Sequence, residues 1–484
     1  MALKVYNYLT RELERFRPIN REHVNMYVCG PTVYDHSHLG HAKTYVSMDV
    51  VVRYLRYTGY QVTYVRNLTD VGHLLRTGED RIMRGARREG IQPMEVVDTY
   101  IRSFHEDMDA LGVIRPNISP RATCHVPEMI EWVRDLIDQG HAYEVNGNVY
   151  FSIESFPDYG KLSHREIEDM EAGARVAVRE EKRNPADFAL WKRAEPEHIM
   201  RWPSPWGEGY PGWHIECSVM SSKYLGETFD IHGGGLENMF PHNDCEIAQS
   251  EARNNAQFAN YWLLVGSLTV DGVQMSKSLG NFLTIKDALK LYSPEAIRYF
   301  VLTSHYRGSV DYSREALQSA QRGINRFHNT VRKLRRRMEN MAPTSGAGTA
   351  ALSSVMSLEG YRDDFKAAMD DDFNTPQALS VIFELVKEVN RTLEQRQDTS
   401  LGTLSAMDKI FRDLAGDVLG VLPENLDSRV SGDRVAGLVE TLLALRNEYR
   451  AEKAWDKADA IRDRLSELGI AIEDGQDKTT WSLK

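Results

Sequence analysis

The stretch Val24-Asn25-Met26-Tyr27-Val28, followed ten residues later by His38-Leu39-Gly40-His41, decides the fold that this chain is expected to adopt. The first five residues have the apolar character of a buried strand, and residues 42–57 have helical spacing. Another strand-like run occupies residues 61–66. Strand, helix and strand in this order are the repeating unit of a parallel sheet, so the sequence predicts an α/β fold. Ligands of such folds bind at the carboxyl ends of the strands.

The four residues beginning at His38 are expected to open the helix. His38 and His41 would then lie near the free N–H groups of a helix start, which bind phosphate well, and Gly40 would let adenine approach the chain. More than 200 residues later, Met275-Ser276-Lys277-Ser278 offers Lys277 to a pyrophosphate, so that positive groups converge from both sides. Each motif alone also fits capping histidines or an exposed turn, but their order and separation together favour nucleotide activation.

Composition restricts the class of protein. A chain of 484 residues with 42% hydrophobic residues can bury several cores, which predicts two to four domains. The net charge of −11 argues against binding of polyanions by the overall charge of the protein, so any nucleic-acid contact must be made by a local basic patch. No apolar run approaches membrane-spanning length, and residues 1–16 lack the order of a signal peptide, which predicts a cytoplasmic protein without a membrane partner. Four scattered cysteines favour reduced thiols or metal ligands over disulfides.

Breaks in the periodicity suggest several segments. Residues 119–205 are irregular and rich in Pro, Gly and charge, as expected of an inserted subdomain. Beyond the Lys277 motif the chain becomes helical, with helix starts at Ser293-Pro294 and Thr375-Pro376. Residues 342–354 are expected to form a flexible connection. In the last unit, one helical face is expected to carry Trp455, Ala458, Ile461, Leu465 and Leu468 before Gly469 ends the helix.

Four scattered residues have side chains of the types that bind zinc: Cys29, Cys217, His242 and Glu246. Thiolate, imidazole and carboxylate are all zinc donors, and a helix would aim residues 242 and 246 at one point. The alternative is that the two cysteines are small buried hydrophobes and the other two a surface helix pair. Spacing alone favours this alternative.

Longer strings resemble one family. They are Cys29-Gly30-Pro31-Thr32-Val33-Tyr34-Asp35, Gly212-Trp213-His214-Ile215-Glu216-Cys217, Phe229-Asp230-Ile231-His232-Gly233-Gly234-Gly235 and the Lys277 motif. Together they are similar to the cysteinyl-tRNA synthetases, a class I aminoacyl-tRNA synthetase family. The resemblance covers nearly the whole chain, because residues 462–463 and 469–475 also resemble the carboxyl-terminal module of that family.

The resemblance implies an enzyme that joins L-cysteine to ATP, releases pyrophosphate and transfers the aminoacyl group to tRNA(Cys). It implies that His38 and His41 stabilise the phosphates of Mg-ATP and that Lys277 holds the departing pyrophosphate. Cys29, Cys217 and the His242/Glu246 pair match the zinc ligands of the family, with one zinc per chain. Zinc would tell cysteine from serine by binding the softer, more acidic thiol, which makes an editing site unnecessary.

Further roles follow from the same likeness. Gly40, Asp230 and Gly234 are assigned with the catalytic histidines and Lys277 to ATP binding. Cys29, Thr69, Trp213 and His214 are assigned to the substrate pocket, where the alternative for the last two is a packed tryptophan beside a core histidine. A monomer is expected. The seven basic residues from Arg322 to Arg337 are the best local patch for tRNA, although a solvated charged face has the same composition.

The expected architecture is α/β: a Rossmann-type parallel-sheet catalytic domain with an inserted subdomain, followed by a helical bundle and a small C-terminal anticodon-binding domain. The domain boundaries are 1–118 for the first half of the catalytic domain, 119–205 for the inserted connective subdomain, 206–262 for the second catalytic half, 263–316 for a linker domain with the Lys277 loop, 317–426 for the tRNA-contacting bundle and 427–484 for the anticodon-binding module.

Two departures from the family pattern concern the site. Gln274 replaces the first lysine of the usual Lys-Met-Ser-Lys-Ser, which removes one cationic contact. Cys245 stands beside Glu246, but neighbours on a helix differ by about 100°, so both cannot easily point inward. Two rival functions are a ligase that transfers activated cysteine to an amino sugar and a synthetase-derived binding protein without catalysis. The helices after Leu317 favour tRNA over the first, and retention of His38 and Lys277 opposes the second.

Overall fold

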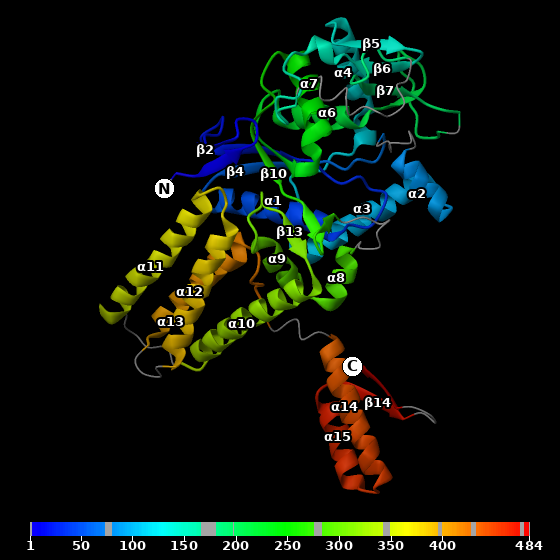
Figure 1. Cartoon of the computed structure of the whole chain (residues 1–484). Coiled ribbons are helices and arrows are strands. Elements are labelled where there is room, and N and C mark those ends of the chain that lie inside the picture. The colour runs from blue at the N-terminus through cyan, green and yellow to red at the C-terminus, as the bar shows by residue number, and fades with distance from the viewer. Residues whose placement is uncertain are drawn as a thin grey trace. The chain divides into compact units, whose positions relative to one another are not determined.

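The structure is a computed structural model that describes residues 2–72, 80–165, 181–196, 198–274, 283–341, 349–394, 399–426, 432–474 and 479–483. The chain divides into two compact units, Met1–Pro423 and Glu424–Lys484 (Figure 1). Among the described residues, no helix has both the length and the apolar composition needed to cross a membrane.

The centre of the larger unit is a four-stranded parallel sheet. Its order is β10 (Ala259–Val265), β9 (Phe229–Gly235), β3 (His23–Val28) and β4 (Gln61–Arg66). Helix α1 (Leu39–Tyr57) connects β3 to β4, so the strand–helix–strand unit predicted from the sequence is confirmed. Most residues of these strands are buried, as is usual where helices cover both faces of a parallel sheet.

Helices lie on both faces of this sheet. In Figure 1, α1 lies on one side, and α6 (Trp213–Leu225) and α7 (Asp244–Asn254) lie on the other. Helices α2 (Arg81–Glu89) and α3 (Pro93–Ala110) follow β4 in the chain and pack against each other. This arrangement leaves the carboxyl ends of β3, β4 and β9 together at one edge.

The expected inserted region contains a sheet of its own. Helix α4 (Val126–Asp138) precedes an antiparallel sheet whose order is β5 (Ala142–Val145), β6 (Asn148–Phe151), β7 (Phe188–Arg193) and β8 (Gly209–Pro211). Because β8 belongs to this sheet, the sheet extends past residue 205. Gly212 follows β8 directly and is the N-cap of α6, so the antiparallel sheet is tied to the helix that carries Cys217.

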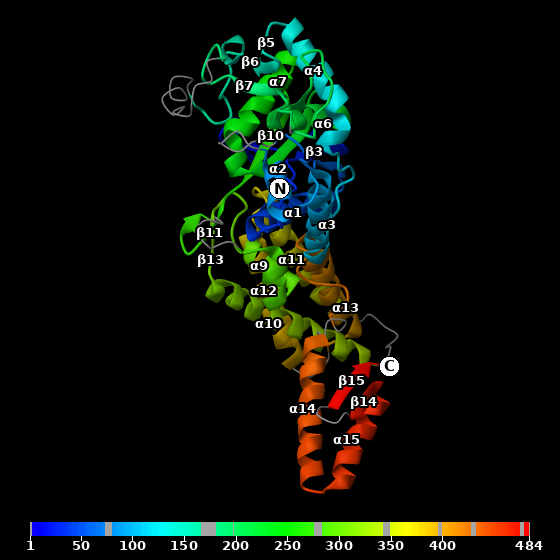
Figure 2. The ribbon, with the colours of Figure 1, turned by 90° about the vertical axis from the view of Figure 1, so that its right-hand side faces the viewer.

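The rest of the larger unit is mainly helical (Figure 2). A small sheet comprises β11 (Leu268–Val270), β12 (Val273–Gln274) and β13 (Val310–Tyr312), and β1 (Lys4–Asn7) pairs with β2 (Glu12–Arg15). The helices are α8 (Ile285–Leu291), α9 (Pro294–Leu302), α10 (Arg314–Glu339), α11 (Thr349–Asp370), α12 (Thr375–Glu394) and α13 (Leu401–Ile410). Helices α10 to α13 pack together as a bundle.

The helices predicted to start at Ser293-Pro294 and Thr375-Pro376 are both present, since α9 begins at Pro294 and α12 at Thr375. Ser293 caps α9 by accepting a hydrogen bond from the Ala296 N–H, and Pro294 occupies the first turn, as predicted. Of the flexible connection predicted for residues 342–354, residues 342–348 lie outside the described residues, and the prediction is wrong for the rest, because α11 begins at Thr349. Ala350, Ala351 and Leu352 are strong helix formers, and their propensity prevails over the small-residue composition that suggested a linker.

The smaller unit is a helical hairpin with a β-hairpin. It contains α14 (Gly432–Ala451), α15 (Trp455–Glu467), β14 (Ile470–Asp474) and β15 (Thr479–Leu483). The predicted helix is present, and Gly469 follows it with φ +77°. Trp455 and Leu468 are 56% and 73% exposed, so these two residues of the predicted face do not pack in the core of this unit. Within this unit, Leu465 and Ile470 pack with two apolar residues of α14.

A buried ion pair joins α1 to α9. Arg298 on α9 and Asp49 on α1 lie 2.6 Å apart, and their side chains are 1% and 0% exposed. The same guanidinium donates to the carbonyl oxygens of Leu111 after α3 and Leu419 after the bundle helices. Its donors are therefore shared among three parts of the unit, which compensates for removing this charge from water.

We expect Arg298→Ala to reduce the free energy of unfolding by about 1.5–3 kcal/mol, because it removes a buried charge-assisted contact of Asp49, which then keeps Arg53 as its remaining arginine partner. Arg412→Ala is the control, since Arg412 is 56% exposed in its pair with Asp408 and should contribute at most about 1 kcal/mol. Urea unfolding followed by tryptophan fluorescence measures both. Equal losses in the two variants would contradict the role of Arg298.

Candidate active site and metal centre

A cavity of about 770 Å³ opens at the carboxyl edge of the parallel sheet. Its volume lies in the range of small-molecule sites, and its position is where open α/β sheets bind ligands. Many residues proposed from the sequence line it: Cys29, His38, His41, Thr69, Trp213, Cys217 and His242. The walls therefore come from segments that are up to about 200 residues apart in the chain.

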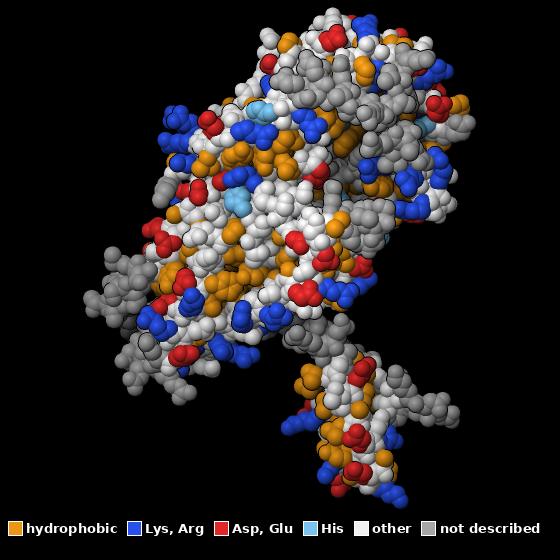
Figure 3. Space-filling model, in the orientation of Figure 1, with side chains coloured by type: hydrophobic (Ala, Val, Ile, Leu, Met, Phe, Trp, Pro, Cys, Tyr) orange, Lys and Arg blue, Asp and Glu red, His pale blue; other side chains and the backbone are white. Residues whose placement is uncertain are grey.

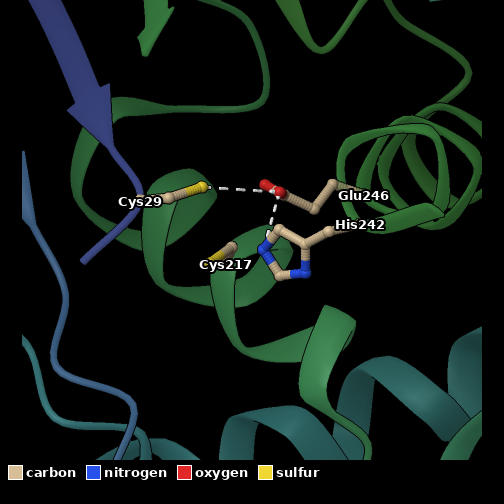
Figure 4. A group of neighbouring side chains, drawn as sticks. All are labelled: Cys29, Cys217, His242 and Glu246. Atoms are coloured by element: carbon tan, nitrogen blue, oxygen red, sulfur yellow. Dashed lines mark hydrogen bonds and ion pairs between the residues drawn. The ribbon is translucent and has the colours of Figure 1, made fainter. Parts of the chain in front are cut away.

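Four potential metal ligands converge beside this cavity. Cys29 follows β3, Cys217 lies on α6, His242 precedes α7 and Glu246 lies on α7. One donor atom from each lies within 4.8 Å of the donors of the other three, and all four residues are buried. Figure 4 shows their side chains pointing toward one another. Spacing alone had favoured two separately buried cysteines and a surface pair formed by His242 and Glu246. That alternative is wrong, because all four residues are buried together.

Hydrogen bonds fix the carboxylate of Glu246 on both oxygens. Its Oε1 lies 3.1 Å from His242 Nε2 and accepts from Asn243 Nδ2 at 2.9 Å. Its Oε2 lies 2.7 Å from the Nε2 of His232, a buried histidine on β9. Burial raises the pKa of Glu246, but the charges of His232 and His242 and the hydrogen bonds outweigh it, so the pKa stays below its ordinary value. Glu246 is therefore an ionised ligand in an apolar setting.

The thiols have the opposite tendency. Burial raises the pKa of Cys217 well above its ordinary value. A hydrogen bond with Cys217 lowers the pKa of Cys29, but burial and the Glu246 charge raise it overall. A thiol in such a place ionises readily only beside a cation, and two thiolates, one imidazole and one carboxylate are a donor set that suits zinc. The residues therefore fit a thiophilic divalent metal.

Cys245 is turned away from this group. Its Sγ lies 3.4 Å from the hydroxyl of Tyr159, and the side chain is buried on a different side of α7 from Glu246. Cys245 does not belong to the cluster of four. The helix geometry expected from the sequence therefore keeps Glu246, and not its neighbour, at the metal centre.

The predicted histidine motif does begin α1. His38 is the N-cap of that helix, its backbone N–H donates to His41 Nδ1 at 3.2 Å, and the two rings stack with centroids 3.9 Å apart. Burial lowers the pKa of His38 to about 4, and burial together with the His38 charge lowers the pKa of His41 well below its ordinary value. Both imidazoles are thus neutral near pH 7. The prediction that positively charged groups converge from both sides is therefore wrong for the side formed by His38 and His41.

Gly40 lies between the two histidines for a steric reason. A Cβ on Gly40 would lie 2.8 Å from atoms of the His38 ring, so a larger residue would displace that imidazole. The opposing motif, residues 275–278 with Lys277, lies outside the described residues. The chain on either side of it is described: Gln274 ends β12, and the Leu39 N–H donates to the Leu283 carbonyl oxygen at 3.2 Å.

Three residues assigned to substrate binding lie around the metal ligands. Thr69 lines the cavity, and its hydroxyl accepts from Asn67 Nδ2 at 3.1 Å. The Trp213 ring stacks on His242 at 4.2 Å. His214 Nδ1 lies 2.8 Å from His242 Nδ1, and burial lowers its pKa to about 4. His214 is not part of the cavity lining, and its Nδ1 faces His242, one of the four potential metal ligands.

The two residues assigned to ATP on β9 lie at different ends of that strand. Gly234 is at the carboxyl end, where its Cβ position is 3.6 Å from Cys29 Cβ. Asp230 is five residues before the end of the strand, about 16 Å from it. Its two carboxylate oxygens accept from the backbone N–H groups of Ile19 and Asn25 at 2.6 and 2.7 Å. Asp230 therefore anchors the amino-terminal segment, and the structure does not bring it to the cavity.

Known protein families match most of the chain. The family described as the tRNA synthetases class I (C) catalytic domain matches residues 15–322, the DALR domain matches residues 364–423, and the cysteinyl-tRNA ligase anticodon binding domain matches residues 434–481. The chain belongs to the cysteinyl-tRNA ligase family. Its fold class, including the parallel sheet and the helical carboxyl-terminal part, is that of the class I synthetases.

Relatives match along their full length. A cysteine–tRNA ligase of Chlorobaculum tepidum is 50% identical over 100% of this chain and 99% of its own. One from Thermus thermophilus is 46% identical over 100% of both. Among solved structures, a Mycobacterium tuberculosis methionyl-tRNA synthetase in complex with methionyl-adenylate has a TM-score of 0.59 at 15% identity, covering 83% of this chain and 92% of that one. That likeness concerns the fold alone.

Sequence reasoning missed three groups at this site. His232 and Asn243 hold Glu246, and their only signal was their place inside or beside strings already quoted. The third group is the set of arginines on α2, which line the cavity. These residues reach the site because distant segments of the chain pack together, and the spacing of residues along the sequence does not reveal such contacts.

We expect the stability of this ligase to fall as the pH decreases from 6.5 toward 4. Since burial lowers the folded-state pKa of His38 to about 4, the unfolded chain binds a proton in this window and the folded chain does not. The stabilisation is present above pH 6.5 and is lost toward pH 4. Urea unfolding at several pH values should show that His38→Asn removes up to about 1.4 kcal/mol per pH unit of this dependence.

His164→Asn is the matched control, because His164 is exposed in a turn and has φ +57°, which Asn tolerates. It should leave the pH dependence as it is in the unmodified protein. An unchanged slope in His38→Asn would contradict the buried, neutral state of that imidazole.

Proposed function

We propose that the chain activates L-cysteine with ATP and transfers it to tRNA(Cys). The observation that carries this proposal is the convergence of Cys29, Cys217, His242 and Glu246 beside the same cavity that His38 and His41 line. Thiol recognition and nucleotide binding thus share one site. The full-length similarity to cysteine–tRNA ligases supports the same reaction.

The cofactor proposed for the four ligands is one zinc ion per chain. Bound zinc would take up the thiol of cysteine as thiolate, which a serine hydroxyl matches poorly because it is harder and much less acidic. The chain's own residues prepare this selection. His232 and Asn243 orient the Glu246 carboxylate, while Trp213 and His214 hold the imidazole of His242.

The nucleotide is proposed to lie with its phosphates at the start of α1. The positive end of the helix dipole favours anions, and a neutral imidazole can donate one hydrogen bond without carrying charge. His38 and His41 would therefore bind phosphate oxygens as neutral donors, with Gly40 between them in the chain leaving room for the nucleotide. Lys277, with Mg accompanying ATP, would supply positive charge to the leaving pyrophosphate. Thr69 lines the same cavity and is proposed to contact the cysteine substrate.

The partner is proposed to be tRNA, contacted by the bundle and the carboxyl-terminal unit. Residues 322–337 all lie on α10, as expected. Two of the basic residues have polar partners within the protein: Arg335 lies 2.8 Å from Asp408, and Arg332 donates to Asn329. Arg322, Arg326, Lys333 and Arg337 are exposed, and their spacing places them on one face of α10. Such a row suits the phosphates of an RNA backbone.

An amino-sugar ligase is the rival reaction. It would use the same cysteine adenylate but would have no need for an anticodon-binding unit, and residues 434–481 match that unit. Charging of tRNA is therefore the better supported second step. The cytoplasmic location and the monomeric state expected from the sequence stay predictions.

Metal dependence provides the direct test. We expect purified protein to contain one zinc per chain by elemental analysis. After removal of the metal, cysteine-dependent exchange of pyrophosphate into ATP should fall at least about 100-fold, because the proposed zinc–thiolate contact is what selects cysteine. Zinc, and not magnesium, should restore exchange. Serine should not support it.

The cysteines of the chain supply matched variants. Cys217→Ser should lose bound zinc, whereas Cys124→Ser should retain it, because Cys124 is exposed and outside the cluster. Cys245→Ser should also retain it, since its Sγ faces Tyr159. Full zinc content in Cys217→Ser would contradict the metal centre, and exchange by a fully metal-free protein would contradict its role.

The α10 row can be tested by filter binding of tRNA(Cys). We expect replacement of Arg322, Arg326, Lys333 and Arg337 by Gln to weaken binding and to reduce the slope of log Kd against log salt by roughly 0.7–0.9 for each lost phosphate contact. The double variant Lys387→Gln with Arg391→Gln is the control, because both residues pair with glutamates on α12. An unchanged salt slope in the α10 variant would show that RNA does not lie on this face.

A further inference from the structure

Helix α2 forms one wall of the cavity and gives it positive charge. Arg81, Arg84 and Arg88 all line the cavity, and their spacing of three and four residues places them on one face of the helix. Gly85 lies on the same face, where a Cβ would be 3.5 Å from the Tyr34 carbonyl oxygen. In Figure 3, Lys and Arg side chains gather in the region of α2.

These three guanidinium groups differ in what they already bind. Arg88 is held by Asp35 at 2.8 Å and by Glu89 at 2.6 Å. Arg81 donates to the Tyr34 hydroxyl at 2.7 Å and lies over that ring at 5.3 Å, while its Nε is buried without a hydrogen-bond partner. Arg84 is exposed and has no carboxylate partner among the described residues. Arg81 and Arg84 therefore retain donors for an incoming anion.

The rest of the described lining carries little positive charge. Besides the α2 arginines, the described lining residues include no Lys or Arg, and they include the carboxylates of Asp35 and Glu237. Burial keeps the imidazoles of His38 and His41 neutral near pH 7. Among the described lining residues, the positive charges that could attract a substrate with several phosphates are therefore those of the α2 arginines.

We propose that Arg81 and Arg84 bind backbone phosphates of the single-stranded 3′ end of the tRNA where it enters the cavity. This inference rests on the proposed function, because the terminal ribose must reach the activated cysteine at this site. Arg84 is exposed on the wall, as contact with an entering polymer requires. Guanidinium groups bind phosphate in bidentate geometry. The lining also includes the aromatic residues Tyr34 and Trp213, and unpaired bases commonly stack on such rings.

The test separates this use of α2 from a role in binding ATP. The variant Arg81→Gln with Arg84→Gln is compared with Arg87→Gln, an arginine of the same helix that does not line the cavity. Two rates are measured: pyrophosphate exchange without tRNA, and single-turnover transfer from preformed enzyme-bound adenylate to subsaturating tRNA(Cys). We expect transfer by the double variant to fall about 10- to 100-fold, with a several-fold smaller effect on exchange, because charge-assisted contacts to RNA are lost.

Binding of shortened tRNA gives a second readout. Unmodified protein should bind tRNA(Cys) more tightly than tRNA(Cys) lacking its three terminal nucleotides, and the double variant should lose this preference. Arg87→Gln should keep the transfer rate and the preference. An equal fall in exchange and transfer would assign the arginines to ATP and overturn the proposal, as would unchanged transfer with an unchanged preference. Absence of exchange in the unmodified protein would instead refute the proposed function.

Discussion

The parallel pairing of β3 with β9 is the constraint on which the site depends. Val28 lies opposite Gly233, and the Cys29 N–H donates to the Gly233 carbonyl oxygen at 2.9 Å. A Cβ on Gly233 would lie 2.9 Å from Met48 Sδ on α1, so glycine at this position lets the helix pack closely on the sheet. This register brings a cysteine near the amino terminus beside residues of α6 and α7, about 200 positions later. A slip by one residue would move its side chain to the other face.

Burial then sets the chemistry of the groups that meet there. The same apolar surroundings keep the imidazoles of His38 and His214 neutral and raise the pKa of the Cys217 thiol. Glu246 remains ionised because His232 and Asn243 contact its two oxygens. An ion buried in this way needs such partners, since the loss of water costs several kcal/mol. The outcome is one fixed anionic oxygen, two thiols and an imidazole, which is an arrangement that a divalent cation would complete.

The cavity thus has three walls with different chemistry. The metal ligands form the first, where selection of the amino acid is proposed. The start of α1 forms the second, where neutral histidines and the positive end of the helix dipole are proposed to bind nucleotide phosphates. Helix α2 forms the third and carries Arg81 and Arg84. If these roles hold as proposed, the separation of soft ligands from phosphate-binding groups would let one site hold a thiol and polyanions without competition between them. The buried Arg298–Asp49 pair fixes the first helix of this site to the bundle.

The sequence by itself determined several local helices and strands and the family to which the chain belongs. Period and composition were enough for β3, α1 and β4, for the start of α9 and for the helix that ends before Gly469, because these depend on neighbours in the chain. The long strings around Cys29 and Cys217 were enough for the family. Small residues such as Ala occur both in flexible connections and in helices. Around Thr349, composition therefore predicted a flexible connection where the structure has the start of α11.

Only the tertiary structure decided which residues meet. It placed Cys29 against Glu246, turned Cys245 toward Tyr159, and gave both oxygens of Asp230 to backbone N–H groups far from the cavity. It also made the histidines of α1 neutral, since a pKa depends on burial by segments that are distant in sequence. Residue types limit what a side chain can do, but contacts and desolvation come from long-range packing, and spacing along the chain does not contain them.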